Sequence, residues 1–360
     1  MIKIYNLINI LKKNSINFFT GVPDSVLKEL SLYISSSKRN NHVIAVNEGS
    51  AVSIGIGYYL AKKKIPCIYM QNSGLSNAIN PLISIADSKV YSIPLLLIIG
   101  WRGSPKFKDE PQHQTKGRIT KKILELLKIK YVRVRNFKDL KKLNNLIKYS
   151  KKSKSPVACL IENKTLEGNI KKIQKFKSDK KKLNKEIFLL KLFEQVKTET
   201  RIISSTGYNS REILSIRQKK KYKKIKDFYM VGGMGHTSSV SLGFSLFTNK
   251  KTICIDGDGS LLMHMGSLKT LADNGKNNLI YILLNNNCHE SVGGQDTYAD
   301  NIDFLKFSEA LGFKKFIQIT NTKQLDVKLK KILSCKTSIF VEVKVSKSKK
   351  NNLPRPKNLI

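Results

Sequence analysis

Residues 252–260 read Thr-Ile-Cys-Ile-Asp-Gly-Asp-Gly-Ser, a short apolar run that ends in an aspartate, Asp258, between two glycines. A second apolar run, Leu-Ile-Tyr-Ile-Leu-Leu at 279–284, ends directly at Asn285-Asn286. Short apolar runs of this kind are typical of strands that are buried on both faces of a parallel sheet. Parallel strands end at one edge of their sheet, where open α/β folds bind ligands, so we expect Asp258 and the asparagine pair to lie close together there.

The residue types at this edge favour a cation and a phosphate. A carboxylate, an amide oxygen and a main-chain carbonyl form the hard oxygen site that Mg²⁺ prefers. Gly257 and Gly259 leave room for the backbone to approach a phosphate group closely. Gly-Asp-Gly is also a common turn sequence, so the motif alone leaves an ordinary turn open.

The rest of the chain alternates short apolar runs with helical periodicity, which predicts α/β architecture with parallel sheets. In the first half we expect helices at 3–12, 24–35 and 48–61 and strands at 16–19, 42–46, 66–70, 95–99 and 156–161. In the second half we expect helices at 186–196, 210–216, 235–247 and 265–274 and strands at 201–204, 252–255, 278–284 and 338–343.

Between the two halves the sequence KKIQKFKSDKKKLNK, residues 171–185, is rich in lysine and poor in large apolar side chains. Such a composition is typical of a solvated linker. We therefore predict a first domain at 1–165, a lysine-rich linker at 166–185 and a second domain at 186–360.

The composition excludes some classes of protein and leaves others open. The chain of 360 residues has a formal net charge of +40, but its lysines are dispersed and no nucleic-acid-binding motif accompanies them, so we expect no nucleic-acid partner. The five cysteines are scattered without the spacing of disulfides or zinc sites, which favours the cytoplasm. The longest apolar run, residues 93–100, is too short to cross a membrane.

The Gly257-Asp258-Gly259-Ser260 motif followed by Asn285-Asn286 resembles the diphosphate-binding motif of thiamine diphosphate enzymes. The resemblance implies thiamine diphosphate and Mg²⁺ as cofactors. It assigns Asp258, Asn286 and the main-chain oxygen of Cys288 as metal ligands.

Two other segments of the second domain resemble the same family. Gly233-Met234-Gly235-His236 resembles the loop that contacts the diphosphate, which implies Met234 as the apolar residue that bends the cofactor; an ordinary core methionine is the less favoured alternative. Thr206-Gly207, after the predicted strand at 201–204, corresponds to further diphosphate contacts. Anions are favoured at helix amino termini, where N–H groups are free.

In the first domain, Asn47-Glu48-Gly49-Ser50-Ala51 resembles the segment that carries the activating glutamate of these enzymes. The chemistry requires a carboxyl group buried against the aminopyrimidine ring of the cofactor. A glutamate at the start of a helix also commonly serves the helix dipole or the cap, and that alternative stays open for Glu48.

Four further motifs are similar to those of phosphonopyruvate and sulfopyruvate decarboxylases: GVPDS at 21–25, QNSGL at 71–75, DEPQHQ at 109–114 and HESVGGQ at 289–295. The resemblance covers nearly the whole chain. It implies two doubly wound parallel-sheet domains, a pyrimidine-binding and a diphosphate-binding domain, with no middle domain.

The same resemblance assigns Asp24 and His113 to proton transfer, a task for which histidine is suited because it titrates near neutral pH. A solvated loop histidine is the alternative. The anionic end of the substrate needs a cation or clustered N–H donors, and Arg102, Lys116 and Arg118 lie near the appropriate loop, although all three can be surface charges.

The implied reaction is decarboxylation of 3-phosphonopyruvate to phosphonoacetaldehyde and CO₂ in phosphonate biosynthesis. Decarboxylation of sulfopyruvate is the alternative, and the presence of both halves in one chain favours phosphonopyruvate. A carboligase is disfavoured because the domain that holds FAD in such enzymes is missing, and a non-catalytic anion or nucleic-acid-binding protein is the alternative from another class. The family also implies a homo-oligomer, at least a dimer, with active sites at the subunit interface.

Overall fold

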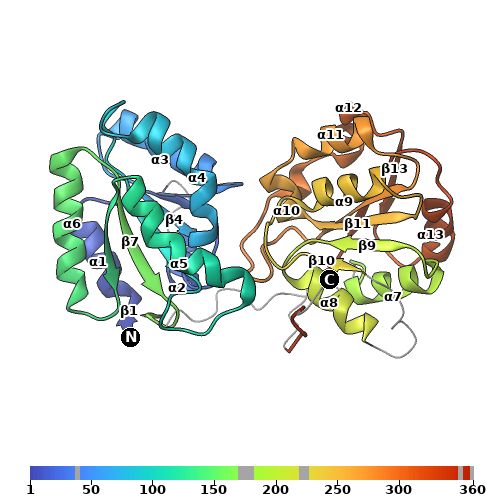
Figure 1. Ribbon diagram of the computed structural model, residues 1–360, viewed down its shortest axis with the longest axis horizontal. Helices are drawn as coiled ribbons and strands as arrows, with labels where there is room; N and C mark the ends of the chain where they lie inside the picture. The colour runs from blue at the N-terminus through green and yellow to red at the C-terminus, as the bar shows by residue number, and fades with distance from the viewer. Residues whose placement is uncertain (37–40, 169–181, 219–226, 348–351, 357–360) are drawn as a thin grey trace. The chain divides into compact units, whose positions relative to one another are not determined.

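The computed structural model describes residues 1–36, 41–168, 182–218, 227–347 and 352–356. The chain divides into two compact units, Met1–Ile173 and Gln174–Ile360 (Figure 1). Most of the predicted linker lies outside the described residues. At its two ends, Leu166–Glu167 form strand β8, which pairs with β1 (Ile2–Lys3), and Lys185 begins helix α7.

Each unit contains one sheet of six parallel strands, and the two sheets have the same strand order. The first sheet runs β3-β2-β4-β5-β7-β6 and the second runs β10-β9-β11-β12-β14-β13. In the first sheet these strands are β2 (Phe19–Gly21), β3 (His42–Ile44), β4 (Cys67–Gln71), β5 (Leu96–Trp101), β6 (Lys130–Val134) and β7 (Val157–Glu162). In the second they are β9 (Arg201–Ser204), β10 (Phe228–Tyr229), β11 (Thr252–Gly257), β12 (Leu279–Asn285), β13 (Lys315–Ile319) and β14 (Ile339–Lys344).

In the first sheet the chain passes from β2 to β3 at one edge and then returns to β4 on the other side of β2. In the second sheet it passes in the same way from β9 to β10 and then to β11. The direction therefore reverses between β2 and β4 in the first unit and between β9 and β11 in the second. At such a switch point the connections leave the carboxyl edge in opposite directions, which opens a crevice where α/β folds bind ligands.

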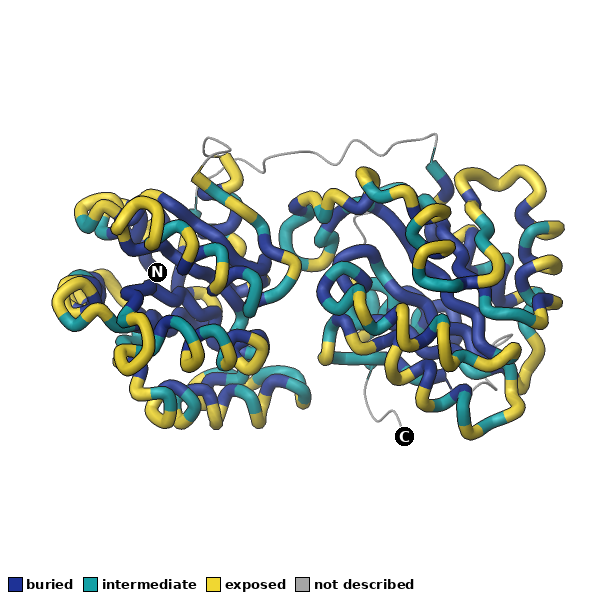
Figure 2. The backbone as a smooth tube through the Cα atoms, turned by 90° about the horizontal axis from the view of Figure 1, so that it is seen from above, coloured by how far each residue is buried: buried dark blue, intermediate teal, exposed yellow. Residues whose placement is uncertain are grey.

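Helices cover both faces of each sheet, and their buried residues form separate cores on the two faces. In the first unit the helices are α1 (Ile4–Lys13), α2 (Lys28–Ser35), α3 (Glu48–Lys62), α4 (Leu75–Pro81), α5 (Pro111–Leu126) and α6 (Asp139–Ser153). The core on one face draws on α1, α2 and α6, and the core on the other draws on α3, α4 and α5. The central strands are accordingly buried along their length, while the helices expose their outer sides (Figure 2).

The second unit repeats this arrangement. Its helices are α7 (Lys185–Gln195), α8 (Tyr208–Arg217), α9 (Thr237–Leu246), α10 (Asp258–Met263), α11 (Ser267–Asn274), α12 (Phe304–Leu311) and α13 (Leu325–Leu333). One core draws on α7, α8 and α13, and the other on α9 to α12. The predicted fold class, two doubly wound parallel-sheet domains, is confirmed. No helix within the described ranges is both long and apolar enough to span a membrane.

Among the described residues, the sequence-based expectation lacks five strands: the edge strands β6, β10 and β13 of the two six-stranded sheets, and the short strands β1 and β8, which pair with each other. Of the three edge strands, β6 and β13 are the longer. β6 reads KYVRV and β13 reads KFIQI, and both are exposed or half-buried for most of their length. Edge strands commonly carry lysine and other charged residues that discourage pairing with another chain. Their polar sequences therefore hide them from a search for buried apolar runs.

Candidate active site

Four segments that the sequence analysis singled out follow four neighbouring strands of the second sheet. Because β10, β9, β11 and β12 are adjacent and parallel, the segments after them lie at the same carboxyl edge. These segments are Gly233–His236 after β10, Thr206-Gly207 after β9, Gly257–Ser260 at the end of β11, and Asn286–Cys288 after β12.

The backbone of these segments uses conformations that glycine adopts most readily. Gly207, Gly233 and Gly235 have φ angles of +88°, +65° and +90°, in the left-handed region. The N–H of Gly235 donates to Oγ of Ser260 over 3.1 Å, which binds the loop after β10 to helix α10. Helices α8 and α9 also begin at this edge, so their free N–H groups lie there.

Two side chains converge on Gly259. A Cβ atom at this position would lie 2.8 Å from Cε1 of His289 and 3.2 Å from Cε of Met234. Met234 is only half-buried, which is unlike an ordinary core methionine. Burial lowers the pKa of His289 to about 4, so its imidazole is neutral near pH 7.

Three oxygen atoms at this edge form a donor set suited to a hard cation. Asp258 is buried, desolvation raises its pKa to about 6, and Thr297 donates a hydrogen bond of 2.6 Å to its Oδ2. Oδ1 of Asn286 accepts the N–H of Cys288 at 3.1 Å, and the carbonyl of Cys288 accepts the N–H of Glu290 at 2.9 Å. Each of these oxygens retains further lone pairs.

The neighbouring Asn285 serves the sheet instead. Its amide donates to Oε1 of the buried Glu342 on β14 over 2.9 Å, and its Oδ1 accepts the N–H of Asn287. Asn285 therefore stabilises the packing of β12 against β14, whereas Asn286 lies at the carboxyl edge of the sheet. Across the described part of the chain, no cluster of three or more His, Cys, Asp or Glu side chains forms a metal site, so a cation here would depend on amide and main-chain oxygens.

In the first unit, Glu48 begins helix α3 with only 5% of its surface exposed. Its Oε2 accepts a hydrogen bond of 2.9 Å from Asn77 on α4. The helix cap is provided by Asn47, whose side chain accepts the N–H of Ser50 at 2.8 Å. Capping therefore does not explain the glutamate, and its carboxyl group is buried at the carboxyl edge of the sheet.

Asp24 follows β2, the strand beside β3, and is 1% exposed. The expected helix from residue 24 begins only at Lys28, because Oδ2 of Asp24 accepts the N–H groups of Val26 and Leu27 in a tight turn. Its Oδ1 accepts a hydrogen bond of 2.6 Å from Gln71 at the end of β4. Desolvation raises the pKa of Asp24, with the bond from Gln71 opposing that rise.

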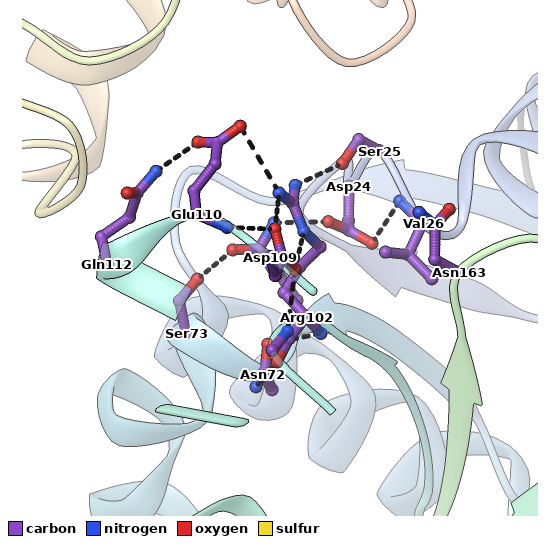
Figure 3. Close-up of polar contacts among 12 residues, drawn as sticks. Asp24, Ser25, Val26, Asn72, Ser73, Arg102, Asp109, Glu110, Gln112 and Asn163 are labelled. Atoms are coloured by element: carbon purple, nitrogen blue, oxygen red, sulfur yellow. Dashed lines mark hydrogen bonds and ion pairs between the residues drawn. The ribbon is translucent and has the colours of Figure 1, made fainter. Parts of the chain in front are cut away.

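Arg102, at the end of β5, is held by acidic neighbours beside Asp24 (Figure 3). Its Nε and Nη2 donate to the two carboxylate oxygens of Asp109 over 2.7 and 2.6 Å, and Glu110 lies 3.8 Å away. Its Nη1 donates to Oγ of Ser25 at 3.2 Å. Of the other two candidate cations, Lys116 is half-buried and Arg118 is exposed.

His113 is buried on helix α5 rather than solvated in a loop, with 9% of its surface exposed. Its Nδ1 has no hydrogen-bond partner in the described protein. Desolvation lowers its pKa to about 4, the positive charges of Arg102 and Lys116 act in the same direction, and Asp109 opposes them. The imidazole is therefore neutral near pH 7.

Several residues that shape the candidate sites of the two units carry no sequence signal of their own. Gln71 and Asn77 hold the carboxylates of Asp24 and Glu48, and Lys185 forms buried ion pairs with Glu212 and Glu290. Gln71 lies in a motif that was noted as a whole, but its partner could not be identified from spacing. Lys185 lies at the end of a lysine-rich run, where nothing in the sequence distinguishes it from the other lysines.

Comparisons with known protein families match one cofactor-binding domain to each half of the chain. Residues 6–124 match the family described as thiamine pyrophosphate enzyme, N-terminal TPP binding domain, and residues 205–343 match the corresponding C-terminal TPP binding domain. Thiamine pyrophosphate is another name for thiamine diphosphate. The two matches fall on the two structural units, one on each.

Three relatives illustrate the similarity. Phosphonopyruvate decarboxylase of Streptomyces viridochromogenes is 28% identical over 354 residues, which cover 94% of this chain and 87% of that protein. Sulfopyruvate decarboxylase of Methanosarcina acetivorans is 27% identical over 360 residues, with 94% of this chain and 89% of that protein covered. The alpha subunit of sulfopyruvate decarboxylase from Methanocaldococcus jannaschii is 37% identical over 158 residues, which cover 43% of this chain and 89% of the subunit.

The family matches, the relatives and the fold lead to the same assignment. The chain belongs to the family of thiamine diphosphate-dependent decarboxylases that includes the phosphonopyruvate and sulfopyruvate decarboxylases.

Proposed function

We propose that the protein decarboxylates 3-phosphonopyruvate to phosphonoacetaldehyde and CO₂ in phosphonate biosynthesis. The observation that carries this proposal is the similarity to phosphonopyruvate decarboxylase along nearly the whole chain. The product is an aldehyde, and the loss of CO₂ makes the step effectively irreversible.

Sulfopyruvate is the second candidate substrate. The presence of both domains in one chain does not separate the two, because the Methanosarcina acetivorans sulfopyruvate decarboxylase also matches this chain along nearly its whole length. The two substrates share the 2-oxo acid and differ in the terminal group, since a phosphonate can carry a second negative charge that a sulfonate lacks. Selectivity between them must therefore come from the charges around that group.

The residues of the second unit fit thiamine diphosphate and Mg²⁺. We propose that Asp258, Asn286 and the carbonyl of Cys288 bind the metal, because they offer a carboxylate, an amide and a main-chain oxygen with lone pairs to spare. The diphosphate contacts would come from Thr206, Gly207, Gly233, Gly235, His236, Gly257, Gly259 and Ser260, with Met234 as the apolar support of the cofactor.

The first unit supplies the proposed proton-transfer groups. When bound, thiamine diphosphate provides an electron sink for the electron pair that the departing CO₂ leaves behind. We propose that Glu48 exchanges a proton with the aminopyrimidine ring through its buried carboxyl group, which Asn77 orients. Asp24 and His113 would deliver the proton to the carbon that has lost CO₂.

The anionic end of the substrate needs positive charge near these groups. Arg102 and Lys116 both lower the pKa of His113, so their positive charges act on the same region. We propose that this region holds the phosphonate. The guanidinium of Arg102 is held in place by its ion pair with Asp109. Arg102 would therefore attract the phosphonate from this position without a change of conformation.

We also propose a homo-oligomer, at least a dimer, with active sites at the subunit interface, and a cytoplasmic location. Complementation tests the first point. Glu48→Gln and Asp258→Asn chains, each inactive alone, should regain part of the activity when mixed under conditions that allow subunit exchange, because mixed dimers would hold one intact site. Mixtures that stay inactive despite exchange would contradict a shared site.

The test of the substrate is CO₂ release by the purified chain with thiamine diphosphate and Mg²⁺, with phosphonopyruvate, sulfopyruvate and pyruvate offered in parallel. We expect kcat/KM to be highest for phosphonopyruvate. A preference for sulfopyruvate would retain the chemistry and replace the proposed substrate. No release from any of the three would contradict the proposal for this group of substrates.

A further inference from the structure

A buried cluster of one lysine and two glutamates lies in the second unit. Nζ of Lys185 is 2.9 Å from Oε1 of Glu212 and 3.0 Å from Oε2 of Glu290. The exposed fractions of the three side chains are 3%, 1% and 6%. Buried charges require partners, and the ammonium group of Lys185 lies within ion-pair distance of both carboxylates.

The lysine is held in place by its own backbone surroundings. Lys185 is the first residue of α7, and the side chain of Asn184 caps this helix by accepting the N–H groups of Glu186 and Ile187. Leu183 forms a parallel bridge with Val345, just beyond β14, and its carbonyl accepts the N–H of Ser346 at 2.9 Å. The ammonium group therefore extends from a fixed point at the carboxyl edge of the sheet.

The two glutamates belong to different segments of the candidate site. Glu212 lies on α8, the helix that follows Thr206-Gly207. Glu290 lies in the loop after β12, and its N–H donates to the carbonyl of Cys288 at 2.9 Å. The N–H of Cys288 in turn donates to Oδ1 of Asn286 at 3.1 Å. A continuous series of contacts thus joins Lys185 to two of the proposed metal ligands.

We propose that Lys185 is a positioning residue that holds the loop at residues 288–290 in the conformation required for binding Mg²⁺ and the diphosphate. This inference rests on the metal ligands of the proposed function. The ion pair to Glu290 fixes the loop from one side, and the ion pair to Glu212 ties the same ammonium group to helix α8. Groups that orient metal ligands without touching the metal commonly change its affinity by about 10–100-fold when removed.

The test measures cofactor binding directly, without turnover. In the full chain, isothermal titration calorimetry gives the Kd of Mg²⁺ at fixed thiamine diphosphate and the Kd of thiamine diphosphate at saturating Mg²⁺. We expect Lys185→Met to raise the Kd of Mg²⁺ by about 10-fold or more. Lys185→Arg, which keeps the charge, should restore most of the affinity.

Another buried ion pair provides the matched control. Arg217 is the last residue of α8 and Asp227 directly precedes β10; they lie 2.8 Å apart with exposed fractions of 5% and 0%, away from the carboxyl edge at which α8 begins. Arg217→Met should lower the midpoint of unfolding as Lys185→Met does, yet leave the Kd of Mg²⁺ within about twofold of the wild type. A similar loss of Mg²⁺ affinity in both variants would mean that Lys185 only stabilises the fold, and it would overturn the inference.

A second variant covers the case in which Lys185→Met fails to fold. Glu290→Gln keeps the side-chain length and leaves Lys185 paired with Glu212, so it weakens only the tie to the loop. It should also raise the Kd of Mg²⁺, and a wild-type Kd in this variant overturns the inference. The measurement contains no substrate. Its result therefore tests Lys185 even if the protein acts on a substrate other than the one proposed. Binding of thiamine diphosphate without any dependence on Mg²⁺ would refute the metal ligands themselves.

Discussion

Gly74 lies where only a residue without a side chain leaves room for Glu48. A Cβ atom on Gly74 would be 2.0 Å from Oε1 and 2.4 Å from Cγ of Glu48. The short helical turn after β4 therefore packs directly against the carboxyl group that starts α3. This contact, together with the hydrogen bond from Asn77, holds the buried glutamate in a single position.

We expect Gly74→Ala to reduce turnover strongly, because the new methyl group must displace the Glu48 carboxylate. Loss of a positioned acid–base group typically lowers the rate about 10²–10⁴-fold. The measurement is the steady-state kcat for CO₂ release. Gly57→Ala, on the helix that Glu48 begins, is the control, because a Cβ atom there would meet open space. It should leave kcat unchanged and stabilise the fold by about 0.5–1 kcal/mol, since glycine is unfavourable inside a helix.

Glu48→Gln separates chemistry from binding. The amide keeps the size of the carboxyl group and can still bond with Asn77, so the site should remain assembled, but it cannot exchange a proton. We expect turnover to be abolished while the Kd of thiamine diphosphate, measured by calorimetry, stays within about threefold of the wild type. Normal activity in this variant would refute the role proposed for Glu48.

Much of this site could be anticipated from sequence because its residues follow buried apolar strands. TICI and LIYILL identify β11 and β12, and Asp258 and Asn286 follow from where those strands end. Contacts between distant segments could not be anticipated. The bond from Gln71 to Asp24 and the ion pairs of Lys185 depend on how loops fold over the sheet, and neither apolar periodicity nor local spacing records that.

Gly259→Ala tests the packing beneath the proposed cofactor site. The new Cβ would lie 2.8 Å from His289 and 3.2 Å from Met234, so one of these side chains must move. Overpacking of this kind commonly costs about 1–3 kcal/mol, which would correspond to about a 5- to 140-fold rise in the Kd of thiamine diphosphate. Gly243→Ala on α9 is the control, because it has open space around it. Equal affinities in the two variants would contradict a cofactor at this edge.

The acid sensitivity of the fold should depend on His113. Burial lowers the pKa of His113 to about 4 from an ordinary value of 6.5. Between these pH values the unfolded chain binds a proton that the folded chain does not. The contribution of the neutral His113 to the free energy of unfolding is therefore complete above pH 6.5, and the free energy of unfolding falls as the pH drops toward 4. We expect His113→Gln to make this fall smaller by about 1–2 kcal/mol, measured by urea unfolding at pH 7 and pH 5.

His42 provides a control that separates this stability effect from catalysis. Burial also lowers its pKa to about 4, and its Nε2 lies 2.8 Å from the hydroxyl of Tyr69. His42→Gln should therefore reduce the acid sensitivity in a similar way but leave kcat unchanged. His113→Gln should in addition lower kcat by about 10²-fold or more, because it removes a member of the proposed proton relay. Equal kcat values for the two variants would show that His113 acts only on the stability of the fold.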